Sequence, residues 1–198
     1  MRVNRKATRR IGFAALSFVA AVGVLASAEW IERTLSAEEE YAVYSAYLSD
    51  GLLGEWSAGG PLKVAVRNTT SVGENLRVNA LCVFDERVYF ARMDRLTRVN
   101  FLVRNLYPTE ILAKFALPRG AIVELTSRSD YFSPEFQKIF PNSQGLVVLS
   151  GVGLNRTRTQ AVFYIDQFCG LCGGGRYVLM IKIDGAWRVH EQHWTWIS

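Results

Sequence analysis

The sequence predicts an α+β domain in which N-terminal helices pack on a curved antiparallel sheet that ends in a four-strand meander. Two observations predict this fold class. Apolar residues recur at helical spacing in the first half of the chain, whereas extended segments alternate with turn residues in the last quarter. An antiparallel sheet must bury one of its faces, so the preceding helices are expected to cover that face.

The clearest predicted helix runs from Glu38 to Leu48. Ser36 is placed to cap it, and three glutamates at 38–40 occupy the first turn, where the helix dipole favours negative charge. Asp50-Gly51 is expected to close the helix. The next segment, Leu62 to Thr70, alternates apolar and polar residues and is predicted to form a half-buried strand.

The middle of the chain is predicted to contain helices and one short strand. Residues 94–108 carry apolar side chains on one helical stripe with arginines between them, and Pro108 ends that helix. A shorter helix is expected over Thr109–Phe115, and a strand over Ile122–Leu125. Ser133-Pro134-Glu135 is typical of a helix start. The members of the stripe are Leu96, Val99, Leu102, Val103 and Leu106.

Turn residues separate the extended segments of the last quarter. Asp184-Gly185 is a strong signal for a tight hairpin, and Gly170 to Gly175 forms a glycine-rich reversal. The segments are therefore expected to pair as an antiparallel meander. They are Gly145 to Ser150, Gln160 to Phe168, Arg176 to Ile183 and Ala186 to Ile197.

The first 28 residues have the layout of an export signal. Five basic residues precede an uncharged apolar run, Ile11 to Ala26, and Ala26-Ser27-Ala28 matches the small-x-small pattern of signal peptidase sites. We expect cleavage after Ala28, with a second acceptable site at Leu35-Ser36-Ala37, and a periplasmic or secreted domain over residues 29–198. The alternative is an uncleaved anchor formed by residues 11–28, and only that alternative involves the membrane.

The basic charge of the chain comes from this leader. Five of the 23 Lys and Arg lie in it and none of the 18 Asp and Glu, which leaves 18 basic against 18 acidic residues. The remaining domain has no net charge to attract phosphates, so nucleic acid is not an expected partner.

Cys169 and Cys172 enclose only Gly170-Leu171 and form the most specific local pattern. A redox pair needs a thiolate stabilised at a helix start, and no helical run begins here, so a structural disulfide is expected. A zinc site would need Cys82, His190 or His193 as further ligands, and we expect neither metal nor cofactor.

Several C-terminal motifs resemble those of a family of uncharacterised exported bacterial proteins that end in a glycine-rich hairpin and a final strand closing on Trp and Ser. The resemblance implies an exported location and no known activity. The segment Asp184 to Val189 is also similar to the last hairpin of nuclear-transport-factor-like cone folds, which implies a curved sheet around helices. The motifs are Phe140 to Gly145, Ser150 to Asn155, Thr159 to Ala161, Cys169 to Gly173, Lys182 to Trp187 and Trp196 to Ser198.

The last strand is expected to contain a bulge. Trp187 and Val189 share one strand parity, whereas Trp194 and Trp196 have the other, so all four face the core only if an extra residue intervenes. Without a bulge His190 and His193 point to opposite faces, and a solvated polar patch is expected there.

No motif identifies a catalytic residue. Ser150-Gly151-Val152-Gly153 lacks the Gly-x-Ser-x-Gly order of a nucleophile elbow. The leading hypothesis is a non-catalytic envelope domain that binds a partner or a small ligand. The alternative is a small pocket enzyme, an isomerase or hydrolase of a small hydrophobic molecule, for which Glu124 is a further candidate acid. Its pocket is expected to be lined by Tyr164, Asp166, Tyr177 and His190.

Overall fold

The computed structural model describes residues 37–52, 62–71, 90–169 and 173–198. The predicted leader and its cleavage sites lie outside these ranges. Contacts divide the chain into Met1–Glu38 and Glu39–Ser198, and the fold described below is that of the second unit. In the described part of the chain, no helix combines the length and the apolar character that crossing a membrane requires.

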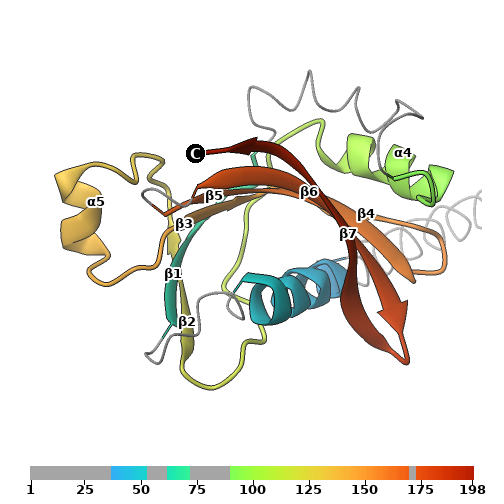
Figure 1. Ribbon diagram of the computed structural model, residues 1–198, viewed down its shortest axis with the longest axis horizontal. Coiled ribbons are helices and arrows are strands. Elements are labelled where there is room, and N and C mark those ends of the chain that lie inside the picture. The colour runs from blue at the N-terminus through green and yellow to red at the C-terminus, as the bar shows by residue number, and fades with distance from the viewer. Residues whose placement is uncertain (1–36, 53–61, 72–89, 170–172) are drawn as a thin grey trace, which may run out of the picture. The chain divides into compact units, whose positions relative to one another are not determined.

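A strongly curved sheet forms the centre of this unit (Figure 1). Its strands run in the order β2-β1-β3-β5-β6-β7, and β4 pairs with β5. β3, β5, β6 and β7 are successive antiparallel neighbours, so the predicted α+β fold and C-terminal meander are confirmed. The strands are β1 (Leu62–Arg67), β2 (Ala121–Thr126), β3 (Leu146–Leu149), β4 (Gly153–Leu154), β5 (Gln160–Phe168), β6 (Gly174–Ile183) and β7 (Ala186–Ile197).

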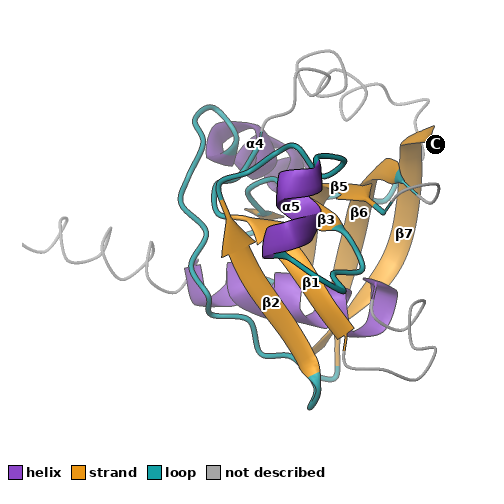
Figure 2. Ribbon diagram, turned by 90° about the vertical axis from the view of Figure 1, so that its left-hand side faces the viewer, coloured by secondary structure: helices purple, strands orange, loops and turns teal. Residues whose placement is uncertain are grey.

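One edge of the sheet is parallel. β1 pairs in parallel with both β2 and β3, and Figure 2 shows β2 as the outer strand of this side. The alternation of residues in Leu62–Arg67 predicts a strand but not its direction, because parallel and antiparallel strands share the same side-chain period. The sheet is thus mixed, with its antiparallel part at the C-terminal end.

The helix over residues 37–47 lies in the hollow of the sheet and continues into a π-helical turn, η1 (Leu48–Leu52) (Figure 1). Tyr44 and Tyr47 are fully buried there, and both rings meet Phe163 of β5 edge to face. The predicted helix is confirmed, although Asp50 and Gly51 belong to the π-helical turn that extends it.

Two shorter helices lie on the convex side of the sheet. α4 (Arg95–Arg104) begins at Asp94, whose carboxylate accepts a hydrogen bond from Leu96 N at 2.7 Å. Its buried residues are Thr97 and Phe101, so most of the apolar stripe expected from the sequence faces solvent instead. α4 lies close to the sheet because Gly153 has no side chain: a Cβ there would come within 2.4 Å of Phe101 Cβ.

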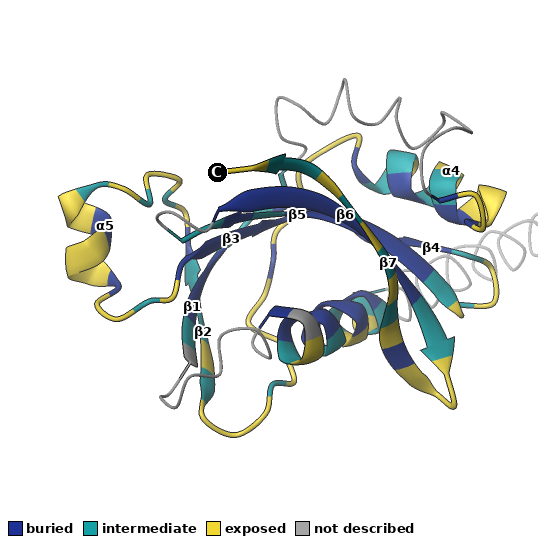
Figure 3. Ribbon diagram, in the orientation of Figure 1, coloured by how far each residue is buried: buried dark blue, intermediate teal, exposed yellow. Residues whose placement is uncertain are grey.

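α5 (Pro134–Ile139) begins at Ser133, as the sequence predicts. Ser133 Oγ accepts a hydrogen bond from Phe136 N at 3.0 Å, and Phe136 is buried with Phe140 against Leu146 of β3. Figure 3 shows that the buried residues of both outer helices face the sheet. Capping chemistry and one buried aromatic ring therefore suffice to position this short helix.

The prediction of a helix over Thr109–Phe115 is wrong. This segment is extended, and Glu110 forms an isolated bridge with Thr69 after the end of β1. Thr70 N donates to Thr109 O at 2.8 Å, and Ile111 N donates to Asn68 O at 2.8 Å. The backbone groups that a helix would pair internally are therefore used across the chain, and Ile111 is buried by this pairing.

β7 contains two irregularities of register with respect to β6. Met180 faces Val189 but Leu179 faces Glu191, so His190 is the extra residue of one bulge. Arg176 faces Trp194 but Gly175 faces Trp196, so Thr195 is the extra residue of a second. The predicted bulge is confirmed. The second bulge places Trp194 and Trp196 on opposite faces of the sheet, which the sequence did not predict.

Candidate functional site

A buried arginine lies on the concave face of the sheet. Arg176 follows the glycine pair at the start of β6, and only 2 % of its surface is exposed. Its strand neighbours in register are Ile165 of β5 and Trp194 of β7. A charged side chain so deep in a sheet requires partners, because transfer of a guanidinium from water to the protein interior is costly.

The described partners of Arg176 are all neutral. Nε donates to Tyr47 Oη at 2.6 Å, and Nη2 donates to Gln167 Oε1 at 3.4 Å, which is a long bond. The guanidinium carbon lies 4.2 Å from the ring centroid of Trp194 and 5.6 Å from that of Tyr47. Within the described ranges Arg176 pairs with no carboxylate, and its Nη1 donates no hydrogen bond.

Backbone features of β6 and β7 assemble this cluster. Gly174 makes room for the indole, since a Cβ at this position would come within 2.5 Å of Trp194 Cζ3. The bulge at His190 turns Gln192 and Trp194 toward the hollow of the sheet, where Gln192 Oε1 accepts a hydrogen bond from Tyr47 Oη at 3.4 Å. The glycine-rich start of β6 is the sequence signal that could have indicated such close packing.

The concave cluster is therefore short of negative charge. Aromatic faces and neutral oxygen acceptors attract a cation, but more weakly than a carboxylate does. Trp194 is 43 % exposed and Gln192 is exposed, so the edge of the cluster meets solvent. An anion placed there would complete the hydrogen bonds of Arg176. We refer to Tyr47, Gln167, Arg176, Gln192 and Trp194 as the Arg176 cluster.

Three of the four predicted pocket residues come together on the opposite, convex face. Tyr164 Oη donates to Asp166 Oδ1 at 2.7 Å, and the rings of Tyr164 and Tyr177 are 5.0 Å apart. Trp196 Nε1 donates to the same oxygen of Asp166 at 2.9 Å. His190 is exposed at its bulge and hydrogen-bonds none of them.

Burial shifts the pKa values of both acidic groups in this convex cluster. It raises the pKa of the Asp166 carboxyl, an effect that the hydrogen bonds from Tyr164 and Trp196 partly offset. Burial also raises the pKa of Tyr164 to about 12, so the phenol remains protonated and donates to Asp166. The hydrogen bonds of Tyr164 and Trp196 thus satisfy the buried carboxyl of Asp166 within the cluster.

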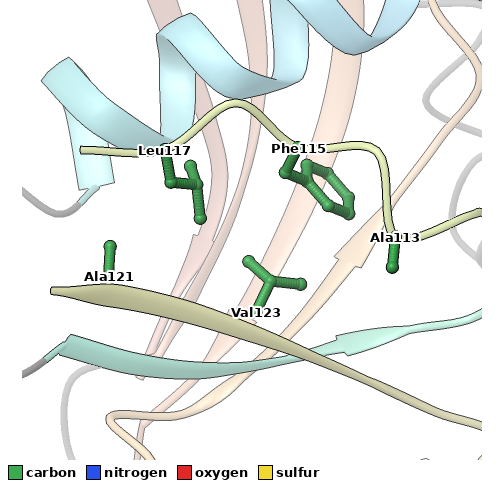
Figure 4. Close-up of a pocket in the computed structure, with 5 residues that line it drawn as sticks. All are labelled: Ala113, Phe115, Leu117, Ala121 and Val123. Atoms are coloured by element: carbon green, nitrogen blue, oxygen red, sulfur yellow. The ribbon is translucent and has the colours of Figure 1, made fainter. Parts of the chain in front are cut away.

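An apolar pocket of about 180 Å³ lies apart from these clusters, beside β2. Figure 4 shows Phe115 and Leu117 facing Ala121 and Val123 across it. None of the described side chains that line it is titratable, and Glu124 instead pairs with Lys63 at 2.8 Å on the neighbouring strand. This pocket can hold an apolar group but brings no acid or base to it.

The remaining candidate functional residues from the sequence are Ser150 and the cysteines. Ser150 is fully buried, and its Oγ accepts from Tyr164 N at 2.7 Å, so it stabilises the chain reversal before β4. Cys172 lies outside the described residues, whereas Cys169 follows β5, with its Sγ 3.6 Å from Gln167 Nε2. Among the described side chains, no group of three or more His, Cys, Asp or Glu is arranged to hold a metal.

Comparison of the chain with family models, with curated proteins and with solved structures finds no match to any of them. The fold and the side-chain geometry are therefore the basis for a functional proposal.

Proposed function

We propose that the protein is an exported, non-catalytic binding domain that holds a small carboxylate-bearing molecule at the Arg176 cluster. One observation carries the proposal: Arg176 is buried, and none of its described partners is negatively charged. A carboxylate accepts two parallel hydrogen bonds from one guanidinium, and two nitrogens of Arg176 are weakly bonded: Nη1 donates to no described residue, and the bond of Nη2 is long.

The surroundings of Arg176 favour a monoanion with a flat apolar body. A single buried cation balances one negative charge, whereas a phosphate dianion would leave excess charge in the site. The half-exposed indole of Trp194 offers a face on which such a body can stack. Gln192 at the rim adds an amide that can bond a polar substituent.

Benzoate and benzamide form a matched pair of probes, because they share the ring and differ in charge. Titration followed by Trp fluorescence and by calorimetry is expected to show binding of benzoate and none of benzamide. Arg176→Met is expected to weaken benzoate binding by about tenfold or more, the magnitude of a charge-assisted hydrogen bond. Arg188→Met, which removes an exposed arginine paired with Asp50, is the control and is expected to leave binding unchanged.

Equal binding of the two probes, no binding of benzoate, or full binding by Arg176→Met would overturn the carboxylate proposal. The enzyme alternative has less support, since Asp166 is enclosed by hydrogen bonds and does not line the apolar pocket. Turnover of a small hydrophobic substrate that is abolished by Asp166→Asn would instead favour an isomerase or hydrolase.

The exported location is the second half of the proposal. It is supported by the basic residues before Ile11–Ala26 and by the small-x-small motif that ends at Ala28. Sequencing the N-terminus of the protein from the envelope fraction is expected to give Glu29. A chain found in the cell interior with Met1 attached contradicts export, and an uncleaved chain in the membrane indicates the anchor formed by residues 11–28.

We also propose that Cys169 and Cys172 form a disulfide in the exported protein. Two observations support it: only Gly170-Leu171 separates the cysteines in the sequence, and this segment joins β5 to β6, which pair in antiparallel fashion up to Gln167 and Gly174. Thiol counting under denaturing conditions is expected to give one free thiol from the three cysteines. Three free thiols after oxidative folding would exclude the bridge.

A further inference from the structure

α4 presents an apolar surface that no described part of the chain covers. The residues on this surface recur at intervals of three or four positions along the helix and continue beyond its end, where Leu106 is 66 % and Tyr107 is 78 % exposed. Isolated exposed apolar residues are common, but a contiguous group on one element marks a site of interaction. We call this group the α4 face: it consists of Leu96, Val99, Val103, Leu106 and Tyr107.

Basic residues flank the α4 face. Arg92 and Arg95 are exposed and form no ion pair with any residue that the structure describes. Arg98 is half-buried, with Nη2 donating to Phe90 O at 2.9 Å. α4 itself contains no acidic residue. An apolar stripe with arginines on its flanks matches the chemistry of an anionic lipid surface, into which apolar side chains insert while guanidinium groups bind the headgroups.

The α4 face lies near the point where the preceding chain enters the domain. Arg104, at the end of α4, forms an ion pair with Glu40, which is in the first turn of helix 37–47. Twelve residues, 27–38, separate Glu39 from the apolar run that ends at Ala26. A chain of that length spans at most ~40 Å. A bilayer that holds or has just released the leader is thus within reach of α4.

We propose that the α4 face is a membrane-docking surface that binds a bilayer containing anionic lipid. A second copy of the chain is a poorer occupant, because a two-fold contact through this face would bring its arginines toward those of the partner. Tyr107 at the end of the face suits the headgroup level, where amphipathic rings gather. The proposal does not depend on the Arg176 cluster, which belongs to the opposite face of the sheet.

Hydrogen exchange of the purified exported protein tests this docking directly. Vesicles of equal parts phosphatidylglycerol and phosphatidylcholine are expected to slow exchange across residues 95–107, whereas pure phosphatidylcholine vesicles are expected to have little effect. Raising the salt concentration is expected to reduce the protection, because the arginines act through screened charges. Exchange is read locally, so protection across residues 95–107 reports contact at α4 and not insertion of an attached leader.

Matched variants separate docking from a change in the fold. The double variant Val99→Glu/Val103→Glu is expected to abolish protection by the anionic vesicles. Phe132→Glu, at an exposed aromatic residue before α5, is expected to retain it. Arg92→Gln/Arg95→Gln leaves the apolar face intact and is expected to remove the preference for phosphatidylglycerol over phosphatidylcholine.

Two outcomes would overturn the proposal. One is that the anionic vesicles leave exchange across α4 unchanged. The other is that α4 becomes protected without vesicles as the protein concentration rises, since this result identifies a second copy as the occupant.

Discussion

Gly175 and Trp196 approach so closely that a Cβ on Gly175 would come within 2.1 Å of the indole Nε1. The same Cβ would lie 2.2 Å from Tyr164 Oη and 2.5 Å from Asp166 Oδ1. The absence of a side chain at this position therefore permits the hydrogen bonds of the convex cluster.

Gly175→Ala is expected to lower the free energy of unfolding by about 1–3 kcal/mol, because the added methyl forces these three groups apart. Urea denaturation measures the change. The control is Gly185→Asn in the turn after β6, where nothing lies within 4 Å and Asn tolerates the positive φ of 81°. Equal losses in the two variants would mean that the crowding at Gly175 has no particular cost.

Arg176→Met is expected to leave the free energy of unfolding unchanged or to raise it by about 2 kcal/mol at most in the absence of ligand. The substitution removes a buried charge that has no anionic partner in the described part of the chain, at the cost of hydrogen bonds to two neutral oxygens. Chemical denaturation in a buffer free of carboxylates is the measurement. A loss of several kcal/mol would show that the guanidinium serves the fold instead of a ligand.

The stability of the protein is expected to fall, relative to Asp166→Asn, as the pH rises. Burial raises the native pKa of Asp166 above its ordinary value of 3.8. Its contribution is thus fully present below about pH 4 and is lost as the pH increases through the native pKa. Unfolding of both proteins at about pH 3.5 and about pH 7 gives the difference. If that difference is the same at both values, the carboxyl titrates normally.

The ion pair between Glu40 and Arg104 is expected to stabilise the fold far more than an exposed ion pair does. Glu40 is buried, and its Oε1 accepts from Tyr44 Oη at 2.9 Å and from Val152 N at 3.0 Å. Arg104→Ala leaves this carboxylate without its cation and is expected to cost about 3 kcal/mol. Arg188→Ala, which breaks an exposed pair with Asp50, is expected to cost less than about 1 kcal/mol. Thermal unfolding of both variants gives the comparison.

The local chemistry of turns and caps predicted much of this fold. Asp184 and Gly185 have the positive φ values that a two-residue hairpin requires, and Ser133 caps α5 as expected. The prediction of a helix at Thr109 failed because this backbone pairs with residues 39 to 43 positions earlier in the sequence, which no local pattern reveals. Periodicity likewise predicted a helix at α4 but could not show which of its sides packs on the sheet.

The Arg176 cluster could not be found from the sequence for a related reason. Its members come from helix 37–47 and from three strands, and the register between β6 and β7 depends on two bulges. Two local signs were present in the sequence: the glycines that precede Arg176, and the charge of Arg176 itself shortly before the apolar run Val178 to Ile181. The convex cluster of Tyr164, Asp166 and Tyr177 was partly anticipated, whereas Trp196 was not.

The extra residue at Thr195 has a consequence for spectroscopy. Trp194 stacks on a guanidinium in the hollow of the sheet, while Trp196, two positions later, hydrogen-bonds a carboxylate on the outer side. The chain contains five tryptophans, so the difference in emission between the parent protein and a variant with Phe at position 194 or 196 reports the replaced indole and therefore a single side of the sheet. Occupancy of the hollow and titration of the outer carboxyl can then be followed separately in the same folded molecule.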